Sequence, residues 1–254
     1  NLTFTNANWN SAQTVTVTGV DDNLVDGNIN TTITMAVVDA SSDDNFDDVA
    51  NQTVTATTTD NDTAGFTLSK TTATVSEGAD TDTYTVVLNA QPDSDVVITV
   101  TSADTGEVTV SAAELTFTNG NWNSAQTVTV TGVDDNLVDG SVNTLVTMAV
   151  KDASSDDNFD GVSDQTVTVT TTDNDTAGFT LSSTTATVTE AAGGGNTATY
   201  TVVLNAQPDS DVVISVTSGD TGEATVSAAN LTFTNANWNS AQTVTVTGVD
   251  DNLV

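Results

Sequence analysis

The chain has 254 residues, of which 35 are Asp or Glu and only two are Lys or Arg, so its formal net charge is −33. Because almost no cation is available to neutralise phosphates, this charge excludes nucleic acid as a natural partner and disfavours anionic membrane surfaces. No hydrophobic span is long enough to cross a membrane, so we expect no direct membrane insertion. There is no cysteine and therefore no disulfide.

One segment occurs three times with little change, beginning at Asn1, Glu114 and Asn230. The tryptophan within it recurs at spacings of 113 and then 116 residues. Periods of this size are typical of whole domains in series rather than of solenoid turns. The Asp-Asn-Asp-Thr strings place the boundaries, and they predict the later part of one repeat at 1–62, a complete repeat at 63–175 and the earlier part of the next at 176–254. We interpret the chain as an excerpt of a longer array; the alternative is that neighbouring copies complete each other's repeats.

Within 63–175, short runs of alternating apolar and polar residues are separated by turn residues, and no helical periodicity accompanies them. In chain order, the apolar positions are Phe66 and Leu68 leading into Val75, then Tyr84, Val86 and Leu88, Val96, Ile98 and Val100, Val108 and Val110, Leu115 and Phe117, Val128 and Val130, Val146, Met148 and Val150, and Val167 and Val169. This pattern predicts an all-β fold of immunoglobulin-like β-sandwiches in a linear array, each with seven or eight strands in two packed sheets. Trp122 is expected to close the core or a sheet edge.

Acidic residues recur at the ends of these strands. In the complete repeat they are Glu77, Asp104, Asp134, Asp135, Asp139, Asp173 and Asp175. Since strand ends converge at one pole of a sandwich, these acids are candidates to lie together. Two carboxylates about 5 Å apart repel by about 3 kcal/mol at an effective dielectric near 20. No Lys recurs between copies to offset this repulsion, because Lys70 is replaced by Ser183 and Lys151 by Val38. Oxygen ligands without His or Cys favour Ca²⁺ over Mg²⁺ as the neutralising ion.

Several short motifs follow one another in a fixed order: Ala-Gly-Phe-Thr (64–67), Val-Ser-Glu (75–77), Leu-Thr-Phe-Thr (115–118), Val-Asp-Asp-Asn-Leu-Val-Asp (133–139) and Asp-Asn-Asp (173–175). This order resembles the Calx-β domain of sodium–calcium exchangers, an integrin cytoplasmic region and very large bacterial surface proteins. The resemblance implies a seven-stranded sandwich with Ca²⁺ at the pole next to the following domain. The implied ligands are Glu77, Asp134, Asp135, Asp139, Asp173 and Asp175, with Asp104 a weaker candidate.

The partial repeats carry equivalents of the same acids: Asp21, Asp22, Asp26, Asp60 and Asp62 in the first, and Glu190, Asp220, Asp250 and Asp251 in the last. Calcium-sensing members of the family carry further acids just after the Asp-Asp stretch, where this chain has Gly140, Ser141 and Val142. We therefore expect one or two ions per junction rather than a larger cluster.

A second acidic loop, residues 154–161, imitates the start of a calcium loop through Asp156, Asn158, Asp160 and Gly161. The earlier copy has Asp48 in place of the Gly, and no Glu closes the loop, so a solvated turn facing the preceding repeat is favoured. For the scattered acids, solubility is the simpler explanation, as in a halophilic or marine surface protein.

These observations predict a structural protein that is extracellular or at the cell surface. Calcium at the junctions would stiffen the array into a rod, filament or adhesin stalk, whose partners are neighbouring repeats or identical subunits. The alternative is an adhesive module that binds a surface glycan or protein partner through its loops or Thr-rich faces. An exposed aromatic platform would distinguish this alternative, and Trp122 is the one candidate outside the expected core positions. An enzyme is not expected, because without His or Cys a Ser has no evident base and no thiol nucleophile exists.

Overall fold

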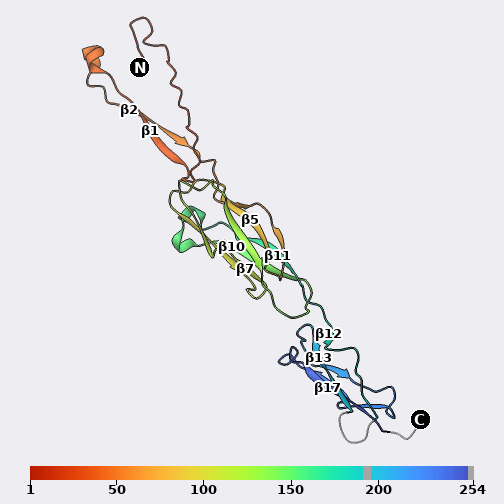
Figure 1. Ribbon diagram of the computed structural model, residues 1–254. Helices are drawn as coiled ribbons and strands as arrows, with labels where there is room; N and C mark the ends of the chain where they lie inside the picture. The colour runs from red at the N-terminus through yellow and green to blue at the C-terminus, as the bar shows by residue number, and fades with distance from the viewer. Residues whose placement is uncertain (191–195, 251–254) are drawn as a thin grey trace.

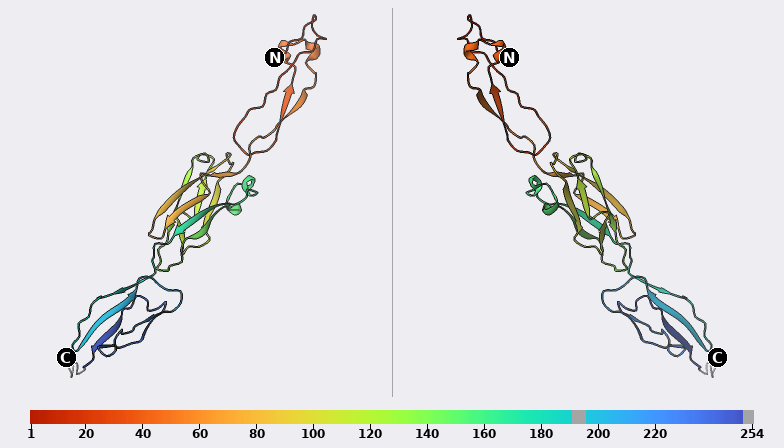
Figure 2. Two further views of the ribbon diagram at one scale, coloured as in Figure 1. Left: turned by 90° about the vertical axis from the view of Figure 1, so that its right-hand side faces the viewer. Right: turned by 90° about the vertical axis from the view of Figure 1, so that its left-hand side faces the viewer.

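In the computed structural model, which describes residues 1–190 and 196–250, three groups of strands follow one another along one long axis (Figures 1 and 2). The section 1–62 holds β1 (Ile29–Met35), η1 (Asp39–Ser41), η2 (Asp44–Phe46) and β2 (Gln52–Thr58). The central repeat, 63–175, holds β3 (Phe66–Leu68), β4 (Thr72–Ser76), β5 (Thr81–Leu88), β6 (Val96–Ser102), β7 (Val108–Val110), β8 (Glu114–Phe117), β9 (Gln126–Gly132), β10 (Val142–Val150), η3 (Asp152–Ser154), η4 (Asp157–Phe159) and β11 (Gln165–Thr172). The section from 176 onward holds β12 (Phe179–Leu181), β13 (Thr197–Leu204), β14 (Val212–Ser215), β15 (Ala224–Val226), β16 (Asn230–Phe233) and β17 (Gln242–Gly248). The η elements are single 3₁₀ turns.

The central repeat is a two-layer sandwich, which confirms the all-β prediction. One sheet has the strand order β4-β11-β10-β6-β8, and the other has the order β3-β5-β9-β7. The alternating apolar side chains of both sheets meet in one buried cluster that includes Tyr84, Ile98, Phe117 and Met148, and Trp122 packs against its margin as a partly buried side chain. Inward-facing Val, Ile and Phe residues and outward-facing Thr residues suit strands with one solvated face.

The run from Phe66 to Val75 forms two strands, although the sequence pattern suggested one, so the repeat has nine strands instead of seven or eight. β3 pairs antiparallel with β5, whereas β4 pairs in parallel with β11 in the opposite sheet. The chain changes sheets at residues 69–71, where Lys70 forms an ion pair with Asp82. An alternation of apolar residues is the same on either sheet, so the crossing could not be read from the pattern.

The section 1–62 forms only the β1–β2 hairpin, with strands equivalent to β10 and β11. The equivalents of β8 and β9, near residues 2–4 and 13–19, contain no assigned strand. Leu2, Phe4, Val15 and Val17 are exposed, whereas their counterparts in the central repeat are buried. Strands lose their ladder when their neighbours are absent, and here the counterparts of β5, β6 and β7 are not beside them.

The section from 176 onward forms the complementary set of strands. Its sheets are β12-β13-β17-β15 and β14-β16, around a smaller core that includes Val202, Leu204 and Phe233. Residues 185–189, the counterpart of β4, form no strand. In the central repeat β4 pairs with β11, and no β11 counterpart lies beside residues 185–189.

Phe159 and Phe46 occupy equivalent positions in two copies of the repeat. Replacing each with Ala tests whether the two side chains differ in burial. The Phe159 side chain is 0% exposed and Phe46 is 57% exposed. Phe159→Ala is expected to lower the free energy of unfolding of the central repeat by about 3–5 kcal/mol. Phe46→Ala is expected to change the stability of the monomeric chain by less than about 0.5 kcal/mol. Denaturant unfolding at low protein concentration measures both, and equal effects would contradict the burial difference.

Candidate metal centre

The parallel pairing of β4 with β11 brings two acids together at one end of the sandwich. Ser76 lies opposite Thr172 in the register, and the Glu77 N–H donates to the Thr172 carbonyl at 3.2 Å. Both strands run in the same direction, so the residues that follow them, Glu77 and Asp173, leave the sheet side by side. The 98-residue span between Glu77 and Asp175 in the sequence is closed by this one ladder.

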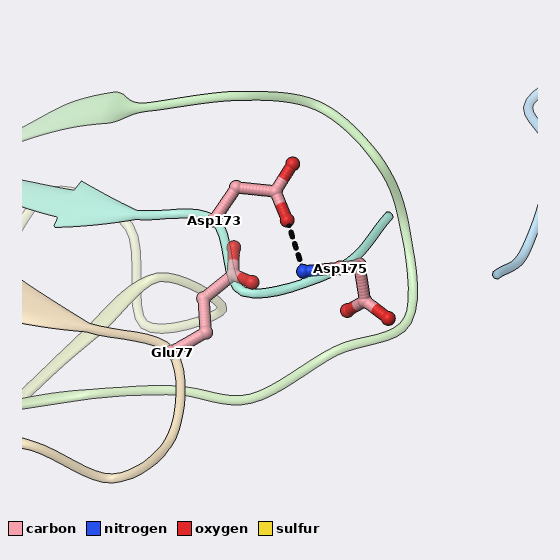
Figure 3. A group of neighbouring side chains, drawn as sticks. All are labelled: Glu77, Asp173 and Asp175. Carbon is pink, nitrogen blue, oxygen red and sulfur yellow. Dashed lines mark hydrogen bonds between the residues drawn. The ribbon is translucent and has the colours of Figure 1, made fainter. Parts of the chain in front are cut away.

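Glu77, Asp173 and Asp175 form the first acidic group, in which one carboxylate oxygen from each residue lies within 4.8 Å of the other two. Figure 3 shows the Glu77 carboxylate directed toward the turn that carries the two aspartates. Asp173 stabilises that turn, because its carboxylate accepts hydrogen bonds from the N–H groups of Asp175 at 2.6 Å and Gly140 at 2.9 Å. Asn174 links the group to its surroundings: its N–H donates to Glu77 and its side-chain amide donates to Asp134.

Glu107, Asp135 and Asp139 form the second acidic group, again with one carboxylate oxygen from each within 4.8 Å of the other two. The antiparallel β7–β9 ladder places Val108 opposite Gly132, and the Val133 N–H donates to the Glu107 carbonyl at 2.9 Å. Glu107 thus lies beside the start of the 134–139 loop. The sequence prediction missed Glu107, although its recurrence as Glu223 was a usable signal.

Gly132 allows the two sheets to approach closely at this pole. A Cβ at this position would lie 2.1 Å from the Ser76 carbonyl oxygen, which is too close for any side chain. The close approach brings the end of β9, and with it the 134–139 loop, next to the end of β4 and Glu77. Gly140 closes the same loop with a φ of +78°, a conformation that glycine adopts at little cost.

The electrostatics of the pole are unfavourable for fully ionised side chains. Burial raises the pKa of Glu77, whose side chain is only 1% exposed, and Asp135, Asp173 and Asp139 add to the increase. Burial also raises the pKa of Glu107, with contributions from Asp139, Asp104 and Asp135. Asp135 and Asp139 therefore act on both groups, so the two groups belong to one electrostatic neighbourhood.

The pKa values of Asp173 and Asp175 are shifted in opposite directions. Hydrogen bonds from the N–H groups of Gly140 and Asp175 lower the pKa of Asp173. Burial raises the pKa of Asp175, and repulsion from Asp173, Asp134 and Asp135 adds to this. The first group thus combines a carboxylate held ionised by backbone donors with two whose charge is opposed.

The acids at this pole fit the oxygen-rich ligand set that Ca²⁺ prefers. Glu107 Oε2 and Asp175 Oδ2 are buried and accept no hydrogen bond. Buried polar atoms without a partner are costly, so each has free capacity for a ligand of opposite charge. Neither lysine serves this purpose, since Lys70 pairs with Asp82 and Lys151 with Glu114.

The structure places the candidate acids of the central repeat in four different settings. Glu77, Asp173 and Asp175 share the first group, and Asp135 and Asp139 belong to the second. Asp134 lies at the edge, where it accepts from the Asn174 side chain. Asp104 caps its own turn by accepting from the Gly106 N–H at 2.8 Å, and Glu107, three residues later, takes the place among the acids that we assigned to Asp104.

The acids of the section 1–62, all of which the structure describes, lie near one another, but no three of them bring carboxylate oxygens within 4.8 Å of one another. Asp60 accepts from the N–H groups of Asp26, Gly27 and Asp62. Burial raises the pKa of Asp62, and repulsion from Asp60, Asp21, Asp22 and Asp26 raises it further.

The acids of the last section are not drawn together among the described residues. Asp220 caps its turn by accepting from the Gly222 N–H at 2.9 Å, and Glu190 and Asp250 are exposed. Asp251 lies outside the described residues.

The loop at 154–161 faces the preceding section, as expected, but one of its acids is not solvated. Asp156 is buried and its carboxylate accepts from the N–H groups of Asp93, Ser94 and Asn158. Burial opposes ionisation of Asp156, but these hydrogen bonds together lower its pKa. Asp156 is thus satisfied as a cap of the 93–95 turn. The Asn158 side chain donates to the Val25 carbonyl at 2.8 Å, across the junction.

The Asp-Asn-Leu-Val loops also contact the next group of strands directly. Leu24 forms a parallel bridge with Gln91, and Leu137 forms one with Gln207. The Gln91 N–H donates to the Asn23 carbonyl and the Gln207 N–H donates to the Asn136 carbonyl, each at 2.7 Å. The loop that supplies Asp135 and Asp139 is therefore also the loop that touches the following section.

The chain matches no protein-family model and no curated protein sequence. Among solved structures it is similar to an apo-form Calx CBD1 domain, at 15% identity and a TM-score of 0.35, over 45% of this chain and 100% of that one. It is also similar to CBD12 from CALX1.2, at 16% identity and a TM-score of 0.32, over 75% and 77% of the two chains. Domains 4 and 5 of the S-layer protein SbsC match at 24% identity and a TM-score of 0.32, over 48% of this chain and 52% of that one. The similarity is one of fold, among β-sandwich domains.

The raised pKa values predict how stability varies with pH when divalent ions are removed. Glu77 and Glu107 have folded-state pKa values above the ordinary 4.5, so the folded state holds these protons more tightly than the unfolded state. Their protonation stabilises the fold at low pH, and this contribution is lost as pH rises from 4.5 through the raised values. Asp173 and Asp156, with lowered pKa values, contribute in the opposite sense only below about pH 3.8.

In chelator, the melting temperature is therefore expected to fall as pH rises from about 4.5 to 7.5. Thermal unfolding across this range measures the effect. The double variant Glu77→Gln, Glu107→Gln should flatten the profile, which separates these two groups from the general repulsion of a highly acidic chain. A profile of unchanged slope in the double variant would contradict the assignment.

Proposed function

We propose that this chain is a structural array of Calx-β-like β-sandwich repeats whose joints are fixed by Ca²⁺. In this proposal the repeat boundaries lie at 62/63 and 175/176, and one or two ions bind at each junction. The array serves outside the cell or at its surface as a rod, a filament or the stalk of an adhesin. Among the described residues, no helix is both long and apolar enough to span a membrane.

The single observation that carries this proposal is the burial of Glu77 among acids. Glu77 is 1% exposed, one of its carboxylate oxygens lies within 4.8 Å of oxygens from two aspartates, and both lysines of the chain pair with other acids. A cation at this point would offset a repulsion of several kcal/mol. Ca²⁺ accepts six to eight oxygen ligands in flexible geometry, which suits acids contributed by loops.

The link from ion binding to stiffness is the loop 134–139. It carries Asp135 and Asp139 of the second acidic group, and its Asn136 and Leu137 contact Gln207 of the next section. An ion held by these aspartates would reduce the freedom of the loop and so of the joint. Bound Ca²⁺ would have a structural role and would take part in no reaction.

The adhesive alternative receives less support from the aromatic residues. Trp122 packs against the core of the central repeat and Trp238 packs against that of the last section. A glycan-binding platform would need such rings to be exposed, and Trp9, which is 71% exposed, lies in the fully described section 1–62, where no packed core surrounds it.

Small-angle scattering and thermal unfolding of the 254-residue chain test the proposal. At calcium concentrations about 100-fold above Kd, binding to the folded state alone contributes about 2.7 kcal/mol, or a rise of about 10 °C in Tm. Chelation should lower Tm by this amount and broaden the distribution of particle dimensions. Asp173→Asn should abolish both responses, and Asp164→Asn, an exposed acid outside the groups, should retain them. If calcium changes neither Tm nor dimensions, the acids serve solubility alone.

A further inference from the structure

The central repeat and the section 1–62 meet end to end (Figure 2), and Gln91 joins them through its backbone. The Gln91 N–H donates to the Asn23 carbonyl at 2.7 Å, and the Gln91 carbonyl accepts from the Val25 N–H at 3.3 Å. Leu24, between these two residues, forms a parallel bridge with Gln91. The joint is therefore a short piece of sheet, and it exists only while the turn that carries Gln91 keeps its position.

Asn119 holds this turn from inside the central repeat by two hydrogen bonds. Its side-chain amide donates to the Pro92 carbonyl at 3.2 Å, and its backbone carbonyl accepts from the Gln91 side chain at 3.1 Å. The donor in the first bond is Nδ2, the group that distinguishes Asn from Asp. An ionised carboxylate only accepts hydrogen bonds, as does a backbone carbonyl. The joint therefore depends on residue 119 being an amide.

Asn119 and Gly120 form the one Asn-Gly pair in the sequence, and the other two copies have Asn-Ala here, at 6–7 and 235–236. Glycine has no Cβ and restricts the backbone least, so its nitrogen can approach the side-chain carbon of the preceding Asn with little hindrance. Asn119 and Gly120 are both exposed, and a Cβ on Gly120 would meet no atom closer than 3.9 Å. The two residues thus have room to rearrange.

The backbone nitrogen of Gly120 is held by a neutral partner. Its N–H donates to the Thr118 hydroxyl at 3.2 Å. In the Asp139–Gly140 pair, by contrast, the Gly140 N–H donates to the Asp173 carboxylate at 2.9 Å. Hydrogen bonds to an ionised acceptor are about twice as strong as those between neutral groups. The Gly120 nitrogen is therefore freer to leave its hydrogen bond and approach the preceding side chain than the Gly140 nitrogen is.

We propose that Asn119 is a site of spontaneous deamidation and that its conversion loosens the joint between the central repeat and the section 1–62. The Gly120 nitrogen forms a bond to Cγ of Asn119, the bond from Cγ to Nδ2 breaks, and the proton of the Gly120 nitrogen leaves with Nδ2 as ammonia. Water then opens the cyclic succinimide at either of its two carbonyls, which gives Asp or isoaspartate at position 119. Both products carry one additional negative charge, and the reaction consumes only water.

Neither product can replace the hydrogen bond that the amide makes. The Pro92 carbonyl loses its donor and faces a carboxylate instead. The same turn continues into Asp93 and Asp95, so the new charge is added to a stretch that is already acidic. Isoaspartate also carries the main chain through the side-chain carbon, which shifts the carbonyl that accepts from Gln91. The reaction involves no metal ion, so it is independent of the proposed calcium site.

Mass spectrometry of the folded protein, incubated at mildly alkaline pH and physiological temperature, tests the chemical step. Peptide mapping is expected to show faster conversion at Asn119 than at Asn6 and Asn235, with both Asp and isoaspartate as products. Gly120→Ala, which introduces the residue found in the other two copies, should reduce conversion at Asn119 to the level at those two positions. Conversion at Asn119 that is no faster than at Asn6, or that is unchanged in Gly120→Ala, overturns the proposal.

Hydrogen exchange tests the effect on the joint. Asn119→Asp reproduces one product and is expected to speed exchange of the Val25 and Gln91 amides. Asn143→Asp is the matched control, because it adds the same charge at an exposed position where the side-chain oxygen only accepts, from the Thr170 hydroxyl. It should leave both amides unchanged. The difference between the variants is expected in calcium and in chelator alike, which separates it from the proposed metal site. Unchanged exchange in Asn119→Asp, or equal acceleration in Asn143→Asp, overturns the proposal.

Discussion

Glu77→Gln is expected to have opposite effects on stability with and without calcium. In chelator the variant should be more stable than the unmodified protein by about 1–3 kcal/mol, because it removes a buried charge that has no cation near it. The amide is nearly the same shape and its oxygen can still accept from the Asn174 N–H. In saturating calcium the variant should be the less stable of the two, because it lacks a ligand.

Thermal and denaturant unfolding in the two conditions measure this reversal of sign. Asp164→Asn, an exposed acid remote from both groups, provides the matched control and should change stability by less than about 0.5 kcal/mol in either condition. A variant that is less stable in both conditions would show that Glu77 acts through its packing. A variant that is more stable in both conditions would show that Glu77 does not bind calcium.

Gly132→Ala is expected to be the most damaging single methyl addition in the central repeat. The new Cβ would lie 2.1 Å from the Ser76 carbonyl oxygen, and backbone has to move to relieve that contact. We expect a loss of about 3 kcal/mol or more in the free energy of unfolding. Because the shift separates the end of β9 from the end of β4, calcium should also stabilise the variant less than it stabilises the unmodified protein.

Gly120→Ala is the matched control, since the Cβ would meet no atom closer than 3.9 Å and the other two copies carry Ala7 and Ala236 at this position. It should be neutral within about 0.5 kcal/mol. Calcium titrations followed by unfolding compare the two variants. Equal calcium responses in Gly132→Ala and the unmodified protein would show that Gly132 does not position the acidic pole.

The sequence predicted the sandwich because two independent patterns agreed. The alternation of apolar residues marks strands with one buried face, as at Tyr84, Val86 and Leu88, and the repetition marks where a unit begins again. The alternation does not predict which of the two sheets a strand joins. The separation of β3 from β4 depends on pairing with β5 and with β11, which are distant in sequence.

The acidic pole was predictable in outline for the same reason. Asp173 and Asp175 recur with Asp134, Asp135 and Asp139, and they follow strands that end at one pole. The choice between Asp104 and Glu107 required the β7–β9 register, which places Glu107 beside Val133 and leaves Asp104 to cap a turn. Recurrence alone does not distinguish them, because both residues recur, as Asp220 and Glu223.

The parallel β4–β11 ladder has a mechanical consequence for a chain under tension. β4 lies near the beginning of the central repeat and β11 near its end, and their residues pair from Thr72–Thr168 to Ser76–Thr172. When the two ends of the repeat are pulled apart, parallel neighbours are drawn past each other along their length. The ladder is then loaded in shear, so its hydrogen bonds share the force and rupture together, whereas an antiparallel hairpin pulled from its open end unzips one bond at a time.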